Sequence, residues 1–151
     1  MSNISRREAR EQILGLLFET EFRADESSVE IYATSVEDRE IPSDEYIKRA
    51  YFGICENREE IDSVIGAHAK GWKTGRLTRL TRSLLRLATY EMLYETGIPY
   101  SVSINEALEL AKRYDEDKAR PFINGVLNAI KNELEASAGA GTETEKDGDE
   151  A

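Results

Sequence analysis

The spacing of apolar residues constrains the fold of this 151-residue chain most strongly, because it follows the period of an α-helix along most of its length. The clearest case is a stripe of apolar residues three or four positions apart: Leu77, Leu80, Leu84, Leu87 and Ala88. Such spacing places all of them on one buried face of a helix. Alternation typical of a strand occurs from Ile98 to Ile104, but Pro99 lacks a ladder donor, so we interpret this segment as an extended connector. The chain is therefore expected to be all-α.

Capping residues and helix breakers divide the chain into about seven helices. Ser5 and Glu8 form an S-x-x-E capping box for a first helix that ends near Phe22. Further helices are expected over residues 29–36, from Pro42-Ser43, from Asn57, from Thr74 or Gly75 to Gly97, from Ser103 and from Pro121. Two packed helical bundles in a single compact domain would bury the apolar stripes of such a set.

The last residues of the chain differ in composition from the rest. Residues 136–151 contain five acids and no large apolar side chain. Such a segment cannot bury enough surface to offset the entropy lost on ordering. We therefore expect a helical domain over residues 1–135 and a disordered acidic tail over 136–151.

The chain has one cysteine, Cys55, and one histidine, His68, which excludes several kinds of site. A single cysteine forms no intramolecular disulfide and fits a reducing cytoplasm. Two such residues are too few for a zinc site, and neither belongs to a hydrolase motif. No Gly-rich phosphate loop and no apolar run of the roughly 20 residues needed to span a membrane is present. We expect a cytoplasmic protein with no catalytic residues, no metal and no cofactor.

The charge of the chain is unevenly distributed. The formal net charge of −10 by itself argues against binding to nucleic acid. Between Asp62 and Glu91, however, there is no acid, and four arginines are spaced by three, three and four residues: Arg76, Arg79, Arg82 and Arg86. On one continuous helix they would share the side opposite the leucine stripe.

A second arginine cluster, formed by Arg6, Arg7 and Arg10, follows the first capping box. The positive end of a helix dipole favours acids at such positions. Guanidinium groups bind phosphate and stack on bases, so both clusters indicate RNA as an anionic partner. A solvated helix face without a partner is the alternative interpretation for each cluster.

Several segments together resemble the NusB family of bacterial transcription antitermination factors. The segments are IPYSVSINEALELAK at residues 98–112, FINGVL at 122–127, LLRLATYE at 84–91 and the arginine-rich start at 6–10. They occur in the family's order and spacing, and the resemblance spans about residues 5–134. Gly75 and Thr81 depart from it, since family members often carry an acid at both positions.

The resemblance implies a helical fold of two bundles and a non-enzymatic function. It implies binding to boxA-type single-stranded RNA of ribosomal-RNA leader transcripts, together with the small ribosomal subunit protein that acts as Nus factor E. RNA polymerase would be affected indirectly, through its elongation complex. A helical protein-interaction module or homodimer that does not bind RNA is the alternative.

The basic clusters and the resemblance together give two sets of expected site residues. RNA contacts are expected at Arg6, Arg7, Arg10, Arg76, Arg79, Arg86, Lys112, Lys118 and Phe122. Contacts with the protein partner are expected at Phe18, Thr81, Arg82, Glu91 and Val102.

Overall fold

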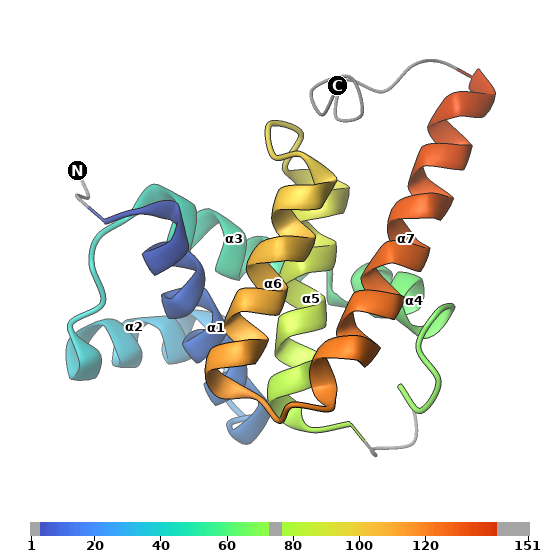
Figure 1. The fold of residues 1–151 in the computed structure, drawn as a ribbon. Coiled ribbons are helices and arrows are strands. Elements are labelled where there is room, and N and C mark those ends of the chain that lie inside the picture. Colours follow the sequence, from blue (N-terminus) through green and yellow to red (C-terminus); the bar gives the residue numbers. More distant parts are fainter. Residues whose placement is uncertain (1–3, 73–76, 142–151) are drawn as a thin grey trace. The chain divides into compact units, whose positions relative to one another are not determined.

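The computed structural model describes residues 4–72 and 77–141, and none of these residues forms a β-strand. Seven helices lie in this part of the chain (Figure 1): α1 (Arg6–Phe22), α2 (Ser28–Arg39), α3 (Glu45–Glu56), α4 (Arg58–Gly66), α5 (Arg79–Tyr94), α6 (Tyr100–Tyr114) and α7 (Ala119–Gly141). The chain divides into two compact units, an N-terminal unit up to Arg58 and a C-terminal unit from Glu59. The predicted all-α class and the division into two groups of helices are confirmed.

The N-terminal unit packs α1 against both α2 and α3. Its core consists of nearly inaccessible apolar side chains: Ile13, Leu16, Ile31, Ile47, Tyr51 and Ile54. The predicted capping box is present, with the Glu8 amide donating to Ser5 Oγ at 3.0 Å and the Ser5 amide donating to Glu8 Oε1 at 2.8 Å. Ser27 and Glu30 form a second capping box, so α2 begins earlier than the predicted residue 29.

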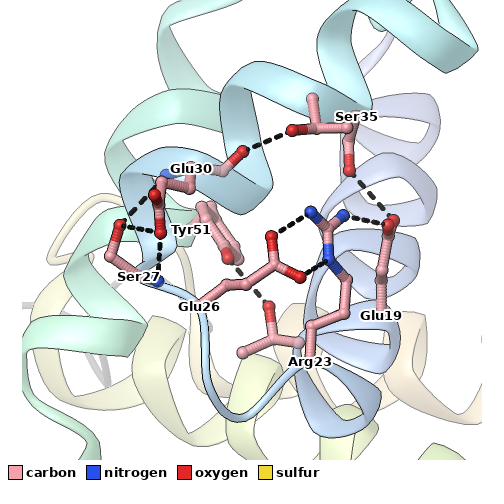
Figure 2. Close-up of polar contacts among 9 residues, drawn as sticks. Glu19, Arg23, Glu26, Ser27, Glu30, Ser35 and Tyr51 are labelled. Atoms are coloured by element: carbon pink, nitrogen blue, oxygen red, sulfur yellow. Dashed lines mark hydrogen bonds and ion pairs between the residues drawn. The ribbon is translucent and has the colours of Figure 1, made fainter.

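A polar cluster on α1 and α2 supplements this apolar core (Figure 2). Glu19 accepts hydrogen bonds from Arg23 Nη1 at 2.6 Å and from Ser35 Oγ at 2.9 Å. Arg39 Nη2 lies 3.5 Å from the same carboxylate. Partial burial raises the pKa of Glu19, but the hydrogen bonds from Arg23 and Ser35 and the charges of Arg39 and Arg23 outweigh it and lower the pKa below its ordinary value. The ionised carboxylate therefore links the two helices.

In the C-terminal unit, α5 packs against α6 and α7, which also pack against each other. Every residue of α5 from Ser83 to Met92 is buried, including its polar ones. The unit's core includes Leu84, Leu85, Ala111, Ile123, Leu127 and Ile130. A helix buried on all sides needs partners for its polar side chains, and these partners decide which α5 residues are available at the surface.

The prediction that α5 starts at Thr74 or Gly75 is not reproduced. Thr78 is the N-cap, and its Oγ1 accepts the Thr81 amide at 3.0 Å, so the helix begins at Arg79. Residues 74 and 75 themselves lie outside the described part of the chain.

The prediction of an extended connector before Ser103 is wrong. α6 begins at Tyr100, directly after Pro99, and its buried residues have helical spacing: Tyr100, Ser103, Ile104, Ala107, Leu110 and Ala111. The apparent alternation of Tyr100, Val102 and Ile104 lies in the first turns of α6, where Tyr100 and Ile104 belong to the buried face and Val102 is exposed. Ser103 is accordingly inside the helix rather than its cap, and its hydroxyl donates to Glu91 Oε1 at 2.8 Å.

Two further boundaries depend on side-chain hydrogen bonds. Asp44 caps α3 by accepting the amides of Tyr46 and Ile47 at 2.9 and 3.0 Å. α4 begins at Arg58, directly after Asn57, where the next helix was expected. Asn57 also ends α3, because its side-chain amide donates to the Gly53 carbonyl at 2.8 Å.

α7 continues past residue 135 to Gly141, so the predicted start of the tail at residue 136 is too early. The alanines at positions 136, 138 and 140 favour this extension, whereas the glycines at 139 and 141 oppose it. Residues 142–151, the rest of the predicted tail, lie outside the described residues. Within the described ranges, no helix is both long and apolar enough to cross a membrane.

Candidate nucleic-acid interface

The arginines at the start of α1 differ in exposure. Arg6 and Arg7 are exposed, and the Arg6 guanidinium carbon lies 3.8 Å from the centroid of the Tyr46 ring on α3. Arg10 is only 5% exposed. Because Arg10 is buried, an RNA contact there would require its side chain to unpack, and the expected contact stays a prediction. Arg6 and Arg7 remain available at this end of the helix.

The arginine series of α5 does not form an exposed stripe. Arg86 is only 3% exposed, and its Nε and Nη2 donate to the two carboxylate oxygens of Asp62 at 2.8 and 3.0 Å. Such a two-pronged pair satisfies the guanidinium inside the unit. An RNA contact at Arg86 would require this pair to open, and the expected contact stays a prediction.

Arg82 is half-buried against the segment that follows α4. Its Nη1 donates to the Trp72 carbonyl at 2.7 Å, and its guanidinium carbon lies 4.3 Å from the centroid of the Trp72 ring. Arg82 therefore has a structural contact besides its predicted contact with a partner. Arg79 is exposed, whereas Arg76 lies outside the described residues.

Two of the expected partner contacts are buried. Thr81 is 4% exposed, and its hydroxyl donates to Asp115 Oδ2 at 2.6 Å. Glu91 is 1% exposed and accepts the Ser103 hydroxyl. Both side chains are satisfied inside the C-terminal unit, which gives each a structural role, and their expected contacts with a partner stay predictions.

The remaining two expected partner contacts are exposed apolar side chains. Phe18 on α1 is 38% exposed and packs edge-on against Phe22, which is 58% exposed, with ring centroids 5.0 Å apart. Val102 on α6 is 40% exposed. Phe22 was missed by the sequence analysis, although its spacing of four residues from Phe18 places the two rings side by side on a helix.

Basic and aromatic residues surround the connection from α6 to α7. Lys112 and Lys118 are exposed, and Phe122 is half-buried. Lys118 Nζ lies 3.7 Å from Glu116 Oε1, an exposed pair of little energetic weight. Tyr114 is exposed and has the Arg113 guanidinium carbon 5.6 Å from its ring centroid, so Lys112-Arg113-Tyr114 adds a stacking surface that the sequence analysis missed.

In the part of the chain that the structure describes, no group of three or more His, Cys, Asp or Glu side chains lies close enough together to hold a metal ion. His68 instead pairs with Glu133 on α7, with 2.7 Å between His68 Nε2 and Glu133 Oε1. The exposed cationic and aromatic side chains are therefore the groups that can recognise a ligand, and their chemistry suits a phosphate backbone with unstacked bases.

Comparison with known proteins gives one family. The NusB family model matches residues 7–132. The transcription antitermination protein NusB of Bacillus pumilus is 41% identical over 134 residues, which cover 87% of this chain and 98% of that protein. A structure of NusB from T. maritima superposes with a TM-score of 0.78 at 38% identity, covering 87% of this chain and 94% of the other. A crystal structure of the antitermination factors NusB and NusE in complex with dsRNA matches with a TM-score of 0.73 at 30% identity, covering 83% and 94%.

Proposed function

The chain belongs to the NusB family, and from this premise we propose that it is a transcription antitermination factor. It binds boxA-type RNA of ribosomal-RNA leader transcripts together with the ribosomal protein that acts as Nus factor E, and it affects RNA polymerase indirectly. The observation that carries this proposal is the match over residues 7–132, together with the similarity to a NusB–NusE complex that contains RNA.

The exposed part of the expected site supports this function. In the N-terminal unit, Arg6 and Arg7 are the available RNA contacts. In the C-terminal unit, the candidates that reach the surface are Arg79, Lys112, Lys118 and Phe122. Arginine and lysine supply the salt-dependent attraction to phosphate, and the partly exposed ring can stack on a base.

We propose that the protein partner contacts the Phe18–Phe22 pair on α1 and Val102 on α6. Exposed aromatic side chains are enriched at protein interfaces because they bury a large area at low entropic cost. Binding accounts for this function without a catalytic step, and the relatives are transcription antitermination proteins. We propose the cytoplasm as its location, where the single cysteine would stay reduced.

Fluorescence anisotropy with a labelled boxA-type RNA tests the proposal. We expect weak binding by the chain alone and tighter binding when the partner protein is added. If four phosphates of a single strand are neutralised, the slope of log K against log salt should be about −3. Because the related complex contains dsRNA, single-stranded and duplex forms of the same sequence are titrated side by side.

A pair of variants shows whether the α1 arginines carry the binding. Arg7→Gln removes an exposed charge at the start of α1, and Lys48→Gln removes one from an exposed position on α3. We expect Arg7→Gln to weaken RNA binding about tenfold and Lys48→Gln to leave it nearly unchanged. Absence of RNA binding by the wild-type chain, with and without the partner, would contradict the proposed function.

The alternative of a helical adapter or homodimer without RNA contact is favoured by one observation, the exposed Phe18–Phe22 pair. Light scattering on the wild-type chain and on Phe22→Ala separates the two functions. A dimer that dissociates in the variant, combined with no RNA binding by either protein, would support the adapter.

A further inference from the structure

A cavity of about 550 Å³ opens in the N-terminal unit where α1 and α3 begin. Its lining includes the two N-caps, Ser5 and Asp44, and two arginines, Arg6 and Arg49. The volume is in the range of pockets that hold a ligand the size of a nucleotide. Arg49 and the ring beside it were not among the site residues expected from the sequence.

Tyr46 fixes both arginines of this cavity. Its ring is 5% exposed and therefore rigidly packed. The guanidinium carbon of Arg6 lies 3.8 Å from the ring centroid and that of Arg49 lies 5.2 Å from it, both within the range of a cation–π contact. One buried ring thus contacts a guanidinium from each of two helices, and both arginines line the cavity.

The remaining groups of the cavity carry charges of both signs. Asp44 and Glu45 contribute two carboxylates, which offset the formal charges of the two arginines. The Asp44 carboxylate, however, is engaged in accepting the amides of Tyr46 and Ile47. The first turns of α1 and α3 each add roughly half a positive charge from the helix dipole. The Glu8 carboxylate, which accepts the Ser5 amide at 2.8 Å, offsets this contribution, so an anion would be attracted by the two arginines rather than by a net charge of the cavity.

We propose that this cavity binds a phosphate group of the RNA backbone, with Arg49 as an additional RNA-contacting residue and Tyr46 as the residue that positions Arg6 and Arg49. The inference rests on the proposed function and extends it from α1 to α3. A guanidinium that contacts a buried ring has less side-chain entropy to lose on binding, which favours a two-pronged contact with phosphate.

The test is an anisotropy titration of the full chain with labelled boxA-type RNA over a salt series. Arg49→Gln is compared with Lys48→Gln, which removes the same charge from the neighbouring exposed position of α3 that does not line the cavity. We expect Arg49→Gln to weaken binding about tenfold and to make the salt slope less steep by about 0.7, as for one lost phosphate contact. Lys48→Gln should retain the wild-type affinity and slope.

Tyr46 needs a pair of variants because its ring is buried. Tyr46→Phe keeps the platform and should bind RNA like the wild type, whereas Tyr46→Leu should reproduce the flatter salt slope of Arg49→Gln. Circular dichroism verifies that both are folded. If Tyr46→Leu unfolds, Arg49→Gln with its control still decides the question.

The outcomes separate this inference from the proposed function. A phosphate contact should weaken binding to boxA and to a scrambled RNA by the same factor, because phosphates carry no sequence information. Displacement of RNA from Lys48→Gln but not from Arg49→Gln by an excess of free nucleoside monophosphate would support the assignment, because the monophosphate competes for the same phosphate-binding groups. Equal affinity and slope for Arg49→Gln and Lys48→Gln would overturn it while leaving RNA binding intact. A wild-type chain that binds no RNA would refute both.

Discussion

Replacing Gly125 by alanine should stabilise this protein. Gly125 lies inside α7, is exposed, and a Cβ atom added there would meet no other atom within 4 Å. Glycine in a helix interior costs about 1 kcal/mol relative to alanine, because it loses more backbone freedom on folding. With no steric cost to subtract, Gly125→Ala should raise the free energy of unfolding by about 0.5–1 kcal/mol. For a chain of this size the melting temperature should rise by roughly 1–4 °C.

Urea unfolding followed by circular dichroism measures this change, and the m-value should stay constant if only stability changes. Gly15 in α1 provides a matched comparison, because its added Cβ would lie 3.0 Å from Arg39 Nη1. Arg39, which lies 3.5 Å from Glu19, would have to shift by a few tenths of an ångström, so Gly15→Ala should gain less than Gly125→Ala. A loss of stability in Gly125→Ala, or a larger gain in Gly15→Ala, would refute the reasoning.

Three other changes follow from buried or coupled polar groups. Arg86→Met should lower the free energy of unfolding by about 2–3 kcal/mol in urea titrations, because it leaves Asp62 without its two-pronged partner; a cost below 0.5 kcal/mol would contradict the structural role. Thr89→Val should raise it by about 1 kcal/mol, since Thr89 Oγ1 is the only side-chain polar atom found buried without a hydrogen-bond partner among the described residues; a decrease would mean that the hydroxyl is satisfied. The pKa of Glu19 is lower in the folded chain, so its contribution to stability is complete above its ordinary value of 4.5 and is lost as the pH falls through the folded value. Acid unfolding of Glu19→Gln should therefore depend less steeply on pH below about 4.5, and an unchanged acid transition would contradict this.

Local features were predictable wherever the contact lies within a few residues. The capping box at Ser5 was read correctly because both of its partners, Ser5 and Glu8, lie in the same turn. The start of α5 was not, since Leu77 and Leu80 continue the leucine spacing across a helix boundary that Thr78 sets. A hydrophobic period shows which face of a helix is buried but not where the backbone starts to be helical.

The first turn of α6 shows that a short apolar pattern can also hide a helix. Tyr100, Val102 and Ile104 fit a period of two, and over five residues this pattern cannot be told from one side of a helix. The structure separates them by burial: Tyr100 and Ile104 are buried four residues apart, and Val102 is exposed. Val102 therefore lies on the surface of a helix and not in an extended connector, and a partner protein can contact it there.

The roles of the arginines could not be assigned from spacing, because each depends on a residue distant in sequence. Asp62 is 24 residues from Arg86 and removes its charge from the surface, and Trp72 contacts Arg82. The acid-free window of residues 63–90 therefore offers RNA less positive charge than its six lysine and arginine residues imply. Among the described residues, its exposed basic side chains are Lys70 and Arg79. Since the rest of the chain is strongly acidic, nonspecific attraction to RNA should be weak, and binding must depend on a few well-placed guanidiniums and on a partner protein. Rigid placement of those few groups, as on the Tyr46 ring, then matters more than the net charge of −10.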